Sequence, residues 1–176
     1  MLKLNMDIKM RLFSILFLIG FIFVSCSSKS DQQMFDEAAK YFEEDKIPES
    51  IAAYEKLATD FPESELAPKA ISQIAGIYHS KKVAALSESE SLMKADSLFY
   101  SVYMKYPDNE QAPLALFMSG FIQANELSDY QRATDTYNTF LEKYSQHELA
   151  VSAREELENM GLSPEEILRK NLAKQE

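Results

Sequence analysis

The stretch "FPESELAPKA", residues 61–70, occurs again forty-five residues later as "YPDNEQAPLA", residues 106–115. A third version, "YSQHELAVSA" at 144–153, keeps the leading aromatic residue, the glutamate and both alanines but has neither proline. Recurrence at a nearly constant spacing is typical of proteins built from stacked structural repeats. The sequence therefore predicts a stack of similar units.

Each repeated stretch has the composition of a corner between two helices. Pro62 disfavours helical geometry at Phe61, so the preceding helix ends there. Ser64, and Asn109 in the second copy, have side chains that cap the start of the next helix. Pro68 then falls in the first turn, where a missing N–H removes no intrahelical hydrogen bond. The stretch therefore predicts the same helix-to-helix corner each time.

The segments between the corners have helical rather than strand periodicity. They are rich in Ala, Leu, Glu and Lys, and the whole chain contains only four glycines. We therefore predict an all-α fold, in which seven helices form a run of pairs with a half pair left over and an eighth forms a tail. The expected helices span residues 33–44, 48–60, 65–81, 90–105, 110–126, 129–144, 147–159 and 164–173.

Small and aromatic residues recur at matching positions in these helices. Before each corner, a small residue is followed by an aromatic residue four positions later and an apolar residue three further on. These sets are Ser50, Tyr54 and Leu57; Ala95, Phe99 and Val102; and Ala133, Tyr137 and Phe140. After the first two corners, a small residue lies near the middle of the helix, at Ala75 and Gly120. Small residues let neighbouring backbones approach while the aromatic rings fill the space opposite, so the pattern predicts stacked helix pairs.

These positions resemble the tetratricopeptide (TPR) repeat, whose first helix has a small residue and an aromatic residue three later. The matching pairs are Ala38 with Tyr41 and Ala75 with Tyr78. The third copy departs from the pattern, because Gly120 is followed by Gln123 and Ser145 replaces the closing proline. The resemblance covers residues 31 to about 160. It implies a TPR-like superhelical stack of antiparallel helix pairs, with about three repeats plus a C-terminal helix.

Residues 1–25 have the layout of a secretory signal peptide. Basic residues precede an unbroken apolar run, "LFSILFLIGFIFV" at 12–24, which is followed by Ser25. The run has 13 residues, whereas a membrane-spanning helix needs about 20. A permanent membrane span is therefore the weaker interpretation.

Cys26, the only cysteine, directly follows the expected cleavage site, so no internal disulfide can form. The sequence "FVSC" resembles the lipobox of bacterial lipoproteins, although Phe23 stands where Leu, Val or Ile is usual. The resemblance implies that Cys26 is diacylated and anchors the chain, with residues 26–32 as a lipidated tether. The alternative is a chance cysteine beside an ordinary cleavage site.

The net charge of the chain limits the kinds of partner that it is expected to bind. The whole chain has a net charge of −10, and removal of the expected signal peptide, with three basic residues and one acidic residue, makes it −12. This acidity argues against nucleic acid and against charge-based binding to anionic lipid. The remaining 151 residues suffice for one domain with a core, expected at 33–160, followed by a C-terminal capping helix and tail at 161–176.

The sequence offers little support for catalysis. His79 and His147 have no acidic or cysteine partner at ligand spacing and are expected to be solvated. The glycines are isolated and form no phosphate-binding loop. The acidic cluster 43–45 lacks the alternating spacing of a calcium loop. We therefore expect no catalytic residue, no metal site and no cofactor, and the protein is not expected to be an enzyme.

The insertion "SKKVAALSESES", residues 80–91, has two interpretations. It is either a longer turn in which Ser87 and Glu90 form a capping box, or a partner-specific loop.

The C-terminal segment "GLSPEEILRKNL", residues 161–172, predicts a helix that begins after a glycine and is capped by Ser163. Its apolar stripe consists of Ile167, Leu168 and Leu172. The stripe either covers the open end of the stack or binds a partner.

The corner pattern, with its aromatic–Pro–acid and Ala-Pro-x-Ala elements, resembles the TPR lipoproteins and periplasmic TPR proteins of the bacterial envelope. The nearest resemblance is to the BamD-type lipoprotein of outer-membrane β-barrel assembly, which has more than three repeats, and the next is to the periplasmic coordinators of the Tol-Pal system. This implies an adaptor that is lipid-anchored in the outer membrane, faces the periplasm and binds envelope proteins or peptide segments. Outer-membrane protein assembly is the first functional hypothesis, envelope coordination during division the second, and a ligand-binding or catalytic protein the third.

The TPR register implies where a partner binds. It places Phe35 and Phe42 of the first repeat, and Leu114, Phe117 and Phe121 of the third, on the groove face. The middle repeat contributes small and polar residues, namely Lys69, Ser72, Gly76 and His79. The alternative is that these phenylalanines are buried by neighbouring helices or by the C-terminal helix.

Overall fold

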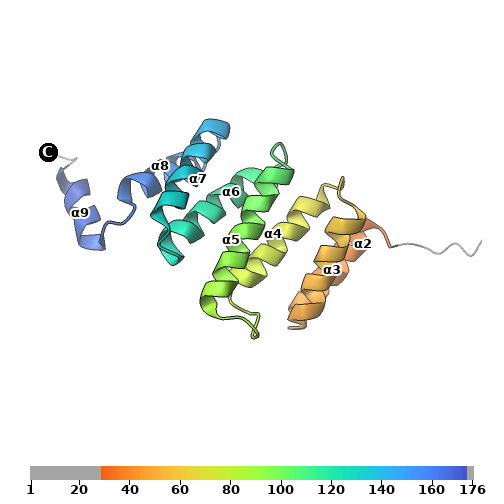
Figure 1. The fold of residues 1–176 in the computed structure, drawn as a ribbon. Helices are drawn as coiled ribbons and strands as arrows, with labels where there is room; N and C mark the ends of the chain where they lie inside the picture. The colour runs from red at the N-terminus through yellow and green to blue at the C-terminus, as the bar shows by residue number, and fades with distance from the viewer. Residues whose placement is uncertain (1–28, 174–176) are drawn as a thin grey trace, which may run out of the picture.

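The computed structural model describes residues 29–173, which are mostly helical and contain no strand (Figure 1). The helices are α2 (Asp31–Glu43), α3 (Ile47–Asp60), α4 (Leu66–His79), α5 (Glu88–Lys105), α6 (Gln111–Phe121), the π-helical segment η1 (Ile122–Glu126), α7 (Tyr130–Lys143), α8 (Ala150–Asn159) and α9 (Pro164–Ala173). The all-α prediction is confirmed. The expected signal peptide and Cys26 lie outside the described residues. Within 29–173, no helix combines the length and the apolarity needed to cross a bilayer.

Successive helices from α2 to α8 pack against one another in a single row (Figure 1). In addition, α4 contacts both α2 and α6. We call the surface formed by α2, α4 and α6 the even-helix face, and the surface formed by α3, α5 and α7 the odd-helix face. The short α9 lies at the end of the row and buries none of its residues (Figure 1).

The core consists of three apolar clusters along this row, and the aromatic and apolar positions of the repeated pattern lie in them. Tyr54 and Leu57 belong to the first cluster, and Phe99 and Val102 belong to the second. The third cluster contains Tyr137 and Phe140. These side chains are buried, which confirms their predicted role in packing between helices.

Gly120 shows why a small residue is needed at a helix crossing. A Cβ atom added there would lie 2.9 Å from a ring carbon of Tyr137, closer than real Cβ contacts allow. Ala75, at the matching position of α4, is completely buried. The predicted close helix crossing is confirmed at Gly120, and at Ala75 the structure shows burial.

The three corners share one pattern of backbone hydrogen bonds. In the first, Phe61 N–H donates to the Leu57 carbonyl (2.9 Å), Ser64 N–H to Phe61 (3.0 Å) and Ala67 N–H to Ser64 (3.0 Å). The equivalent donors are Tyr106, Asn109 and Ala112 in the second corner, and Tyr144, His147 and Ala150 in the third. The corner therefore keeps its geometry even where both prolines are missing.

In each corner, a side chain that precedes the N-cap position also accepts from a backbone N–H at the start of the following helix. Ser64 Oγ accepts from Leu66 N–H at 3.1 Å, and Asn109 Oδ1 accepts from Gln111 N–H at 2.9 Å, as predicted. In the third corner, His147 Nδ1 accepts from Leu149 N–H at 3.2 Å. The prediction of a solvated His147 is wrong, because this half-buried ring takes the place of Ser64 and Asn109 as the capping acceptor.

The insertion at 80–91 forms the turn between α4 and α5 with its residues 80–87, and its residues 88–91 are the first residues of α5. The predicted capping box is confirmed, because Ser87 Oγ accepts from Glu90 N–H and Ser87 N–H donates to the Glu90 carboxylate. Lys82 Nζ lies 4.8 Å from the centre of the Phe42 ring in the first repeat. Lys81 lies 3.8 Å from Glu126 in the third repeat. The insertion thus contacts the repeats on both sides.

The predicted helix 110–126 is divided, because its last turn is the π-helical segment η1. Three successive residues of this segment are buried, namely Ile122, Gln123 and Ala124. In a regular α-helix, successive side chains point about 100° apart, so three in a row cannot all lie on one narrow face. The π-type bond from Leu127 N–H to the Ile122 carbonyl (2.9 Å) widens the turn. This widening brings the Gln123 side chain into the core.

Gln123 belongs to a buried polar network that sequence reasoning missed. Its amide nitrogen donates to Asp96 Oδ1 (2.8 Å) and Ser119 Oγ (3.0 Å). Its amide oxygen accepts from Thr136 Oγ1 (2.8 Å). Asp96, only 2% exposed, also accepts from Ser119 Oγ (2.6 Å) and from the Arg132 guanidinium (2.7 Å). The network therefore joins α5, α6, η1 and α7.

Candidate functional site

The two predicted groove residues of α2 are half-buried and lie under lysines of the next repeat. Phe35 packs edge-to-face on Tyr54, with 5.2 Å between ring centres, and Lys69 Nζ lies 5.4 Å from the centre of its ring. Phe42 lies under Lys82 in the same way. Cation–π contacts of this kind stabilise by about 0.5–1 kcal/mol at exposed sites. The rings of Phe35 and Phe42 are therefore partly covered by lysine side chains of the same chain.

The three predicted groove residues of α6 differ from one another. Leu114 is 49% exposed. Phe117 is half-buried, and its ring centre lies 5.6 Å from that of Tyr137 and 6.1 Å from that of Phe140. Phe121 is half-buried and lines a pocket together with Phe117. Phe117 is thus shared between the third core cluster and the surface.

The middle of the even-helix face is open and polar. A Cβ atom added at Gly76 would meet no heavy atom within 4 Å. The prediction of a solvated His79 is wrong, because its ring nitrogen pairs with the Glu126 carboxylate of the next repeat. The Ser72 hydroxyl is buried without a hydrogen-bond partner among the described residues.

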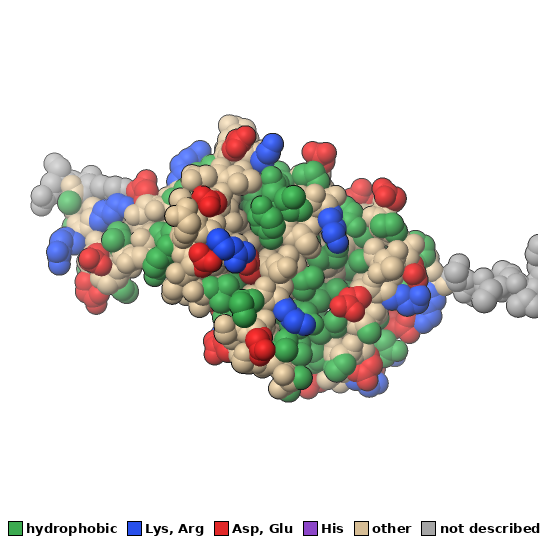
Figure 2. All heavy atoms as spheres, in the orientation of Figure 1, with side chains coloured by type: hydrophobic (Ala, Val, Ile, Leu, Met, Phe, Trp, Pro, Cys, Tyr) green, Lys and Arg blue, Asp and Glu red, His purple; other side chains and the backbone are tan. Residues whose placement is uncertain are grey.

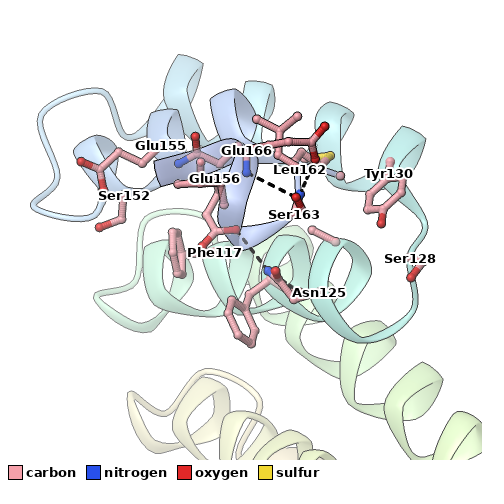
Figure 3. Close-up of a pocket in the computed structure, with 16 residues that line it drawn as sticks. Phe117, Asn125, Ser128, Tyr130, Ser152, Glu155, Glu156, Leu162, Ser163 and Glu166 are labelled. Atoms are coloured by element: carbon pink, nitrogen blue, oxygen red, sulfur yellow. Dashed lines mark hydrogen bonds between the residues drawn. The ribbon is translucent and has the colours of Figure 1, made fainter. Parts of the chain in front are cut away.

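A pocket of about 760 Å³ lies between α6, η1, the start of α7, α8 and the turn into α9 (Figure 3). Three aromatic side chains line it, namely Phe117, Phe121 and Tyr130. Three carboxylates line it as well, namely Glu155 and Glu156 of α8 and Glu166 of α9. We call it the acidic pocket, because no Lys, Arg or His side chain is among its lining residues.

Hydrogen bonds hold the walls of the acidic pocket (Figure 3). The Asn125 side-chain amide donates to the Glu156 carboxylate at 3.1 Å, which links η1 to α8. Ser163 N–H donates to the Glu166 carboxylate at 2.8 Å, and Glu166 N–H donates to Ser163 Oγ at 3.3 Å. The predicted cap at Ser163 is thereby confirmed. These bonds, above all the one from the Ser163 backbone, lower the pKa of Glu166, so its carboxylate is charged at neutral pH.

The helix α9 forms one wall of the acidic pocket through Glu166 and Ile167. The rest of its apolar stripe is not buried against the preceding helices, because Leu168 is 61% exposed and Leu172 is 57% exposed. Lys170 Nζ ties α9 to α8 by donating to the Glu158 carbonyl at 2.7 Å.

A second apolar surface lies on the odd-helix face. Figure 2 shows hydrophobic side chains gathered over α5, with charged side chains scattered around them. The large exposed residues of α5 are Met93, Tyr100 and Met104. The sequence contained these residues, but nothing in their spacing separated them from core positions.

Among residues 29–173, no group of three or more His, Cys, Asp or Glu side chains is placed to hold a metal ion. No protein-family model matches the chain, and no curated protein shows a significant match to it.

Proposed function

We propose that this chain is a lipid-anchored adaptor of the bacterial cell envelope, in which a TPR-like superhelical stack of helix pairs binds segments of other proteins. The observation that carries the proposal is the corner that recurs three times with the same backbone hydrogen bonds. A regular stack presents one continuous face formed by every second helix, and such faces serve as extended binding surfaces in repeat proteins. Binding rather than catalysis is the proposed activity.

The even-helix face has an exposed apolar side chain and an open space along it. Leu114 is half exposed, and the space beside Gly76 is open. An apolar side chain in water contributes little to the fold, whereas its burial by a partner is worth about 25 cal/mol per Å² of apolar surface. Together with Phe35, Phe42, Phe117 and Phe121, this face is the proposed partner groove.

The proposed anchor is a diacylated Cys26 in the outer membrane, with the stack facing the periplasm. Replacing the thiol by Cys26→Ala should abolish fatty-acid labelling and move the protein from the membrane fraction to the soluble fraction. Membrane retention of the variant, with no fatty acid incorporated into the parent protein, would contradict the anchor.

The proposed process is outer-membrane protein assembly, and crosslinking in intact cells tests it. A photo-crosslinking amino acid is placed at Leu114 on the even-helix face and, as a control, at Glu142 on α7. We expect an adduct with a component of β-barrel assembly from Leu114 and not from Glu142. An adduct with a peptidoglycan-linked protein would instead favour envelope coordination. Equal adducts from both positions would contradict a specific groove.

Two substitutions separate binding from folding. Leu114→Asp should weaken partner capture without changing the melting temperature, because Leu114 is half exposed. Phe117→Asp should reduce both capture and stability, since Phe117 packs on Tyr137 and Phe140. A Leu114→Asp variant that captures its partner normally would remove Leu114 from the groove.

A further inference from the structure

The acidic pocket has a chemistry that the rest of the even-helix face lacks. We propose that it binds a partner segment that presents a lysine or arginine next to an apolar side chain. The inference rests on the proposed adaptor function, because it names the chemical class of the segment that the adaptor takes at its C-terminal end.

The charges of the pocket favour a cation. Glu156 is half-buried and accepts from Asn125 of η1, while Glu155 and Glu166 are exposed (Figure 3). In the described part of the chain, none of these three carboxylates forms an ion pair with a Lys, Arg or His side chain. The neighbouring Glu158, by contrast, lies 3.4 Å from Lys170. Three carboxylates without a cation form a surface that a basic side chain complements.

The aromatic side of the pocket suits the same side chains. Tyr130 is 46% exposed, and its ring lies beside Gly161, where an added Cβ atom would be 3.7 Å from a ring carbon. Phe117 and Phe121 line the pocket from α6. Lysine and arginine have long apolar stems that pack on such rings, and their charged ends interact with ring faces. An apolar neighbour in the segment would cover the remaining ring surface.

A buried tyrosine packs behind one of the aromatic residues that line the pocket. Tyr137 is completely buried, and its hydroxyl has no hydrogen-bond partner among the described residues. Its ring packs on Phe117, and the charge of Glu156 adds to the effect of burial in raising the pKa of Tyr137. Both of these neighbours line the acidic pocket. An unsatisfied buried donor is uncommon in folded proteins. Tyr137 does not line the pocket itself, but its ring lies behind the lining residue Phe117.

The pocket has the dimensions of a ligand site. Its volume of about 760 Å³ falls within the range of about 300–1,000 Å³ that is typical of such sites. The turn at Gly161, with φ of 76°, directs the chain from α8 into α9 and closes one side. The pocket therefore has space for a side chain and its neighbours, not only for a surface ion.

Fluorescence anisotropy with synthetic peptides tests the proposal on the full chain purified in detergent. The probe is a short labelled peptide that alternates arginine and leucine. In two matched peptides, glutamate replaces each arginine or serine replaces each leucine. We expect binding of the arginine–leucine peptide only, and we expect the affinity to fall as salt concentration rises.

The variant Glu155→Gln with Glu156→Gln should weaken that binding by about tenfold, the change expected when one charge-assisted contact is lost. The glutamine at 156 keeps an oxygen to accept from Asn125, so the fold is expected to be unchanged in circular dichroism. The control is Glu142→Gln with Glu148→Gln, which removes the same charge from exposed positions outside the pocket.

Each other outcome overturns the proposal. Equal binding of the glutamate peptide, or an equal loss of affinity in both double variants, would show that the pocket does not select a basic segment. No binding of the arginine–leucine peptide would do the same. If the peptide does not bind but Leu114 still forms crosslinked adducts in cells, only the proposed pocket chemistry is wrong. If neither peptide binding nor adducts are observed, the proposed adaptor function is wrong as well.

Discussion

Two junctions between helices in the row differ in the kind of contact that holds their cores together. We call the meeting of α2, α3 and α4 the apolar junction, and that of α5, α6, η1 and α7 the polar junction. In the apolar junction, the polar contact in the core is a single hydrogen bond from Ser50 Oγ to the Ala38 carbonyl at 2.9 Å. In the polar junction, Asp96, Ser119, Gln123 and Thr136 form a connected network.

The difference shows where the third repeat departs from the pattern. The first two copies have an aromatic residue three positions after the small one, at Tyr41 and Tyr78, and both are half-buried. The third copy has Gln123 there, and the helix widens into a π turn that buries it. Apolar packing tolerates small shifts, whereas a buried network is stable only when each donor meets its acceptor. The polar junction therefore specifies one register between the second and third repeats.

The largest effect that we expect comes from the variant Asp96→Ala in the polar junction. It removes the acceptor of Ser119 and Gln123 and the partner of Arg132, so the free energy of unfolding should fall by about 2–4 kcal/mol. Ser50→Ala in the apolar junction should cost only about 1 kcal/mol, because the Ala38 carbonyl keeps its place in a helix. Urea unfolding of both variants checks this. Equal losses would erase the distinction between the two junctions.

The glycines of α4 and α6 should respond to alanine with opposite signs. Gly120→Ala forces the Tyr137 ring to shift and should destabilise the protein by about 1–2 kcal/mol, even after the higher helix propensity of alanine is included. Gly76→Ala adds a methyl group to open space and should stabilise by about 0.5–1 kcal/mol. Thermal unfolding measures both changes. A destabilised Gly76→Ala variant would mean that this part of the even-helix face is already covered.

The smallest effect concerns the third corner, which lacks the prolines of the other two. His147→Ala removes the acceptor of the Leu149 N–H and should lower stability by about 0.5–1 kcal/mol. His147→Asn, which places there the residue type of the second corner, should leave stability unchanged. Hydrogen exchange of the Leu149 amide follows the cap directly. Unchanged exchange in His147→Ala would show that the backbone bonds alone hold the corner.

The sequence by itself determined the elements that depend on neighbours within a few residues. Pro62 and Pro68, the caps at Ser64 and Asn109, and the capping box at Ser87 all act inside one turn of chain, so their effects can be deduced from local order. The spacing of small and aromatic residues likewise determined which helix faces are buried. For these reasons the all-α fold and most helix limits were predictable.

Only the tertiary structure decided which distant side chains meet. Asp96 and Gln123 are separated by 27 positions and Asn125 and Glu156 by 31, and no local rule relates them. Packing of α8 and the turn into α9 against α7 placed three carboxylates around the same pocket as Phe117 and Phe121. Packing also decided that Phe117 is partly core while Leu114 is exposed, although both follow the same helical register. The burial and pairing of a side chain depend on which residues lie opposite it in space. Those neighbours are set by the packing of the helices and cannot be deduced from the local sequence.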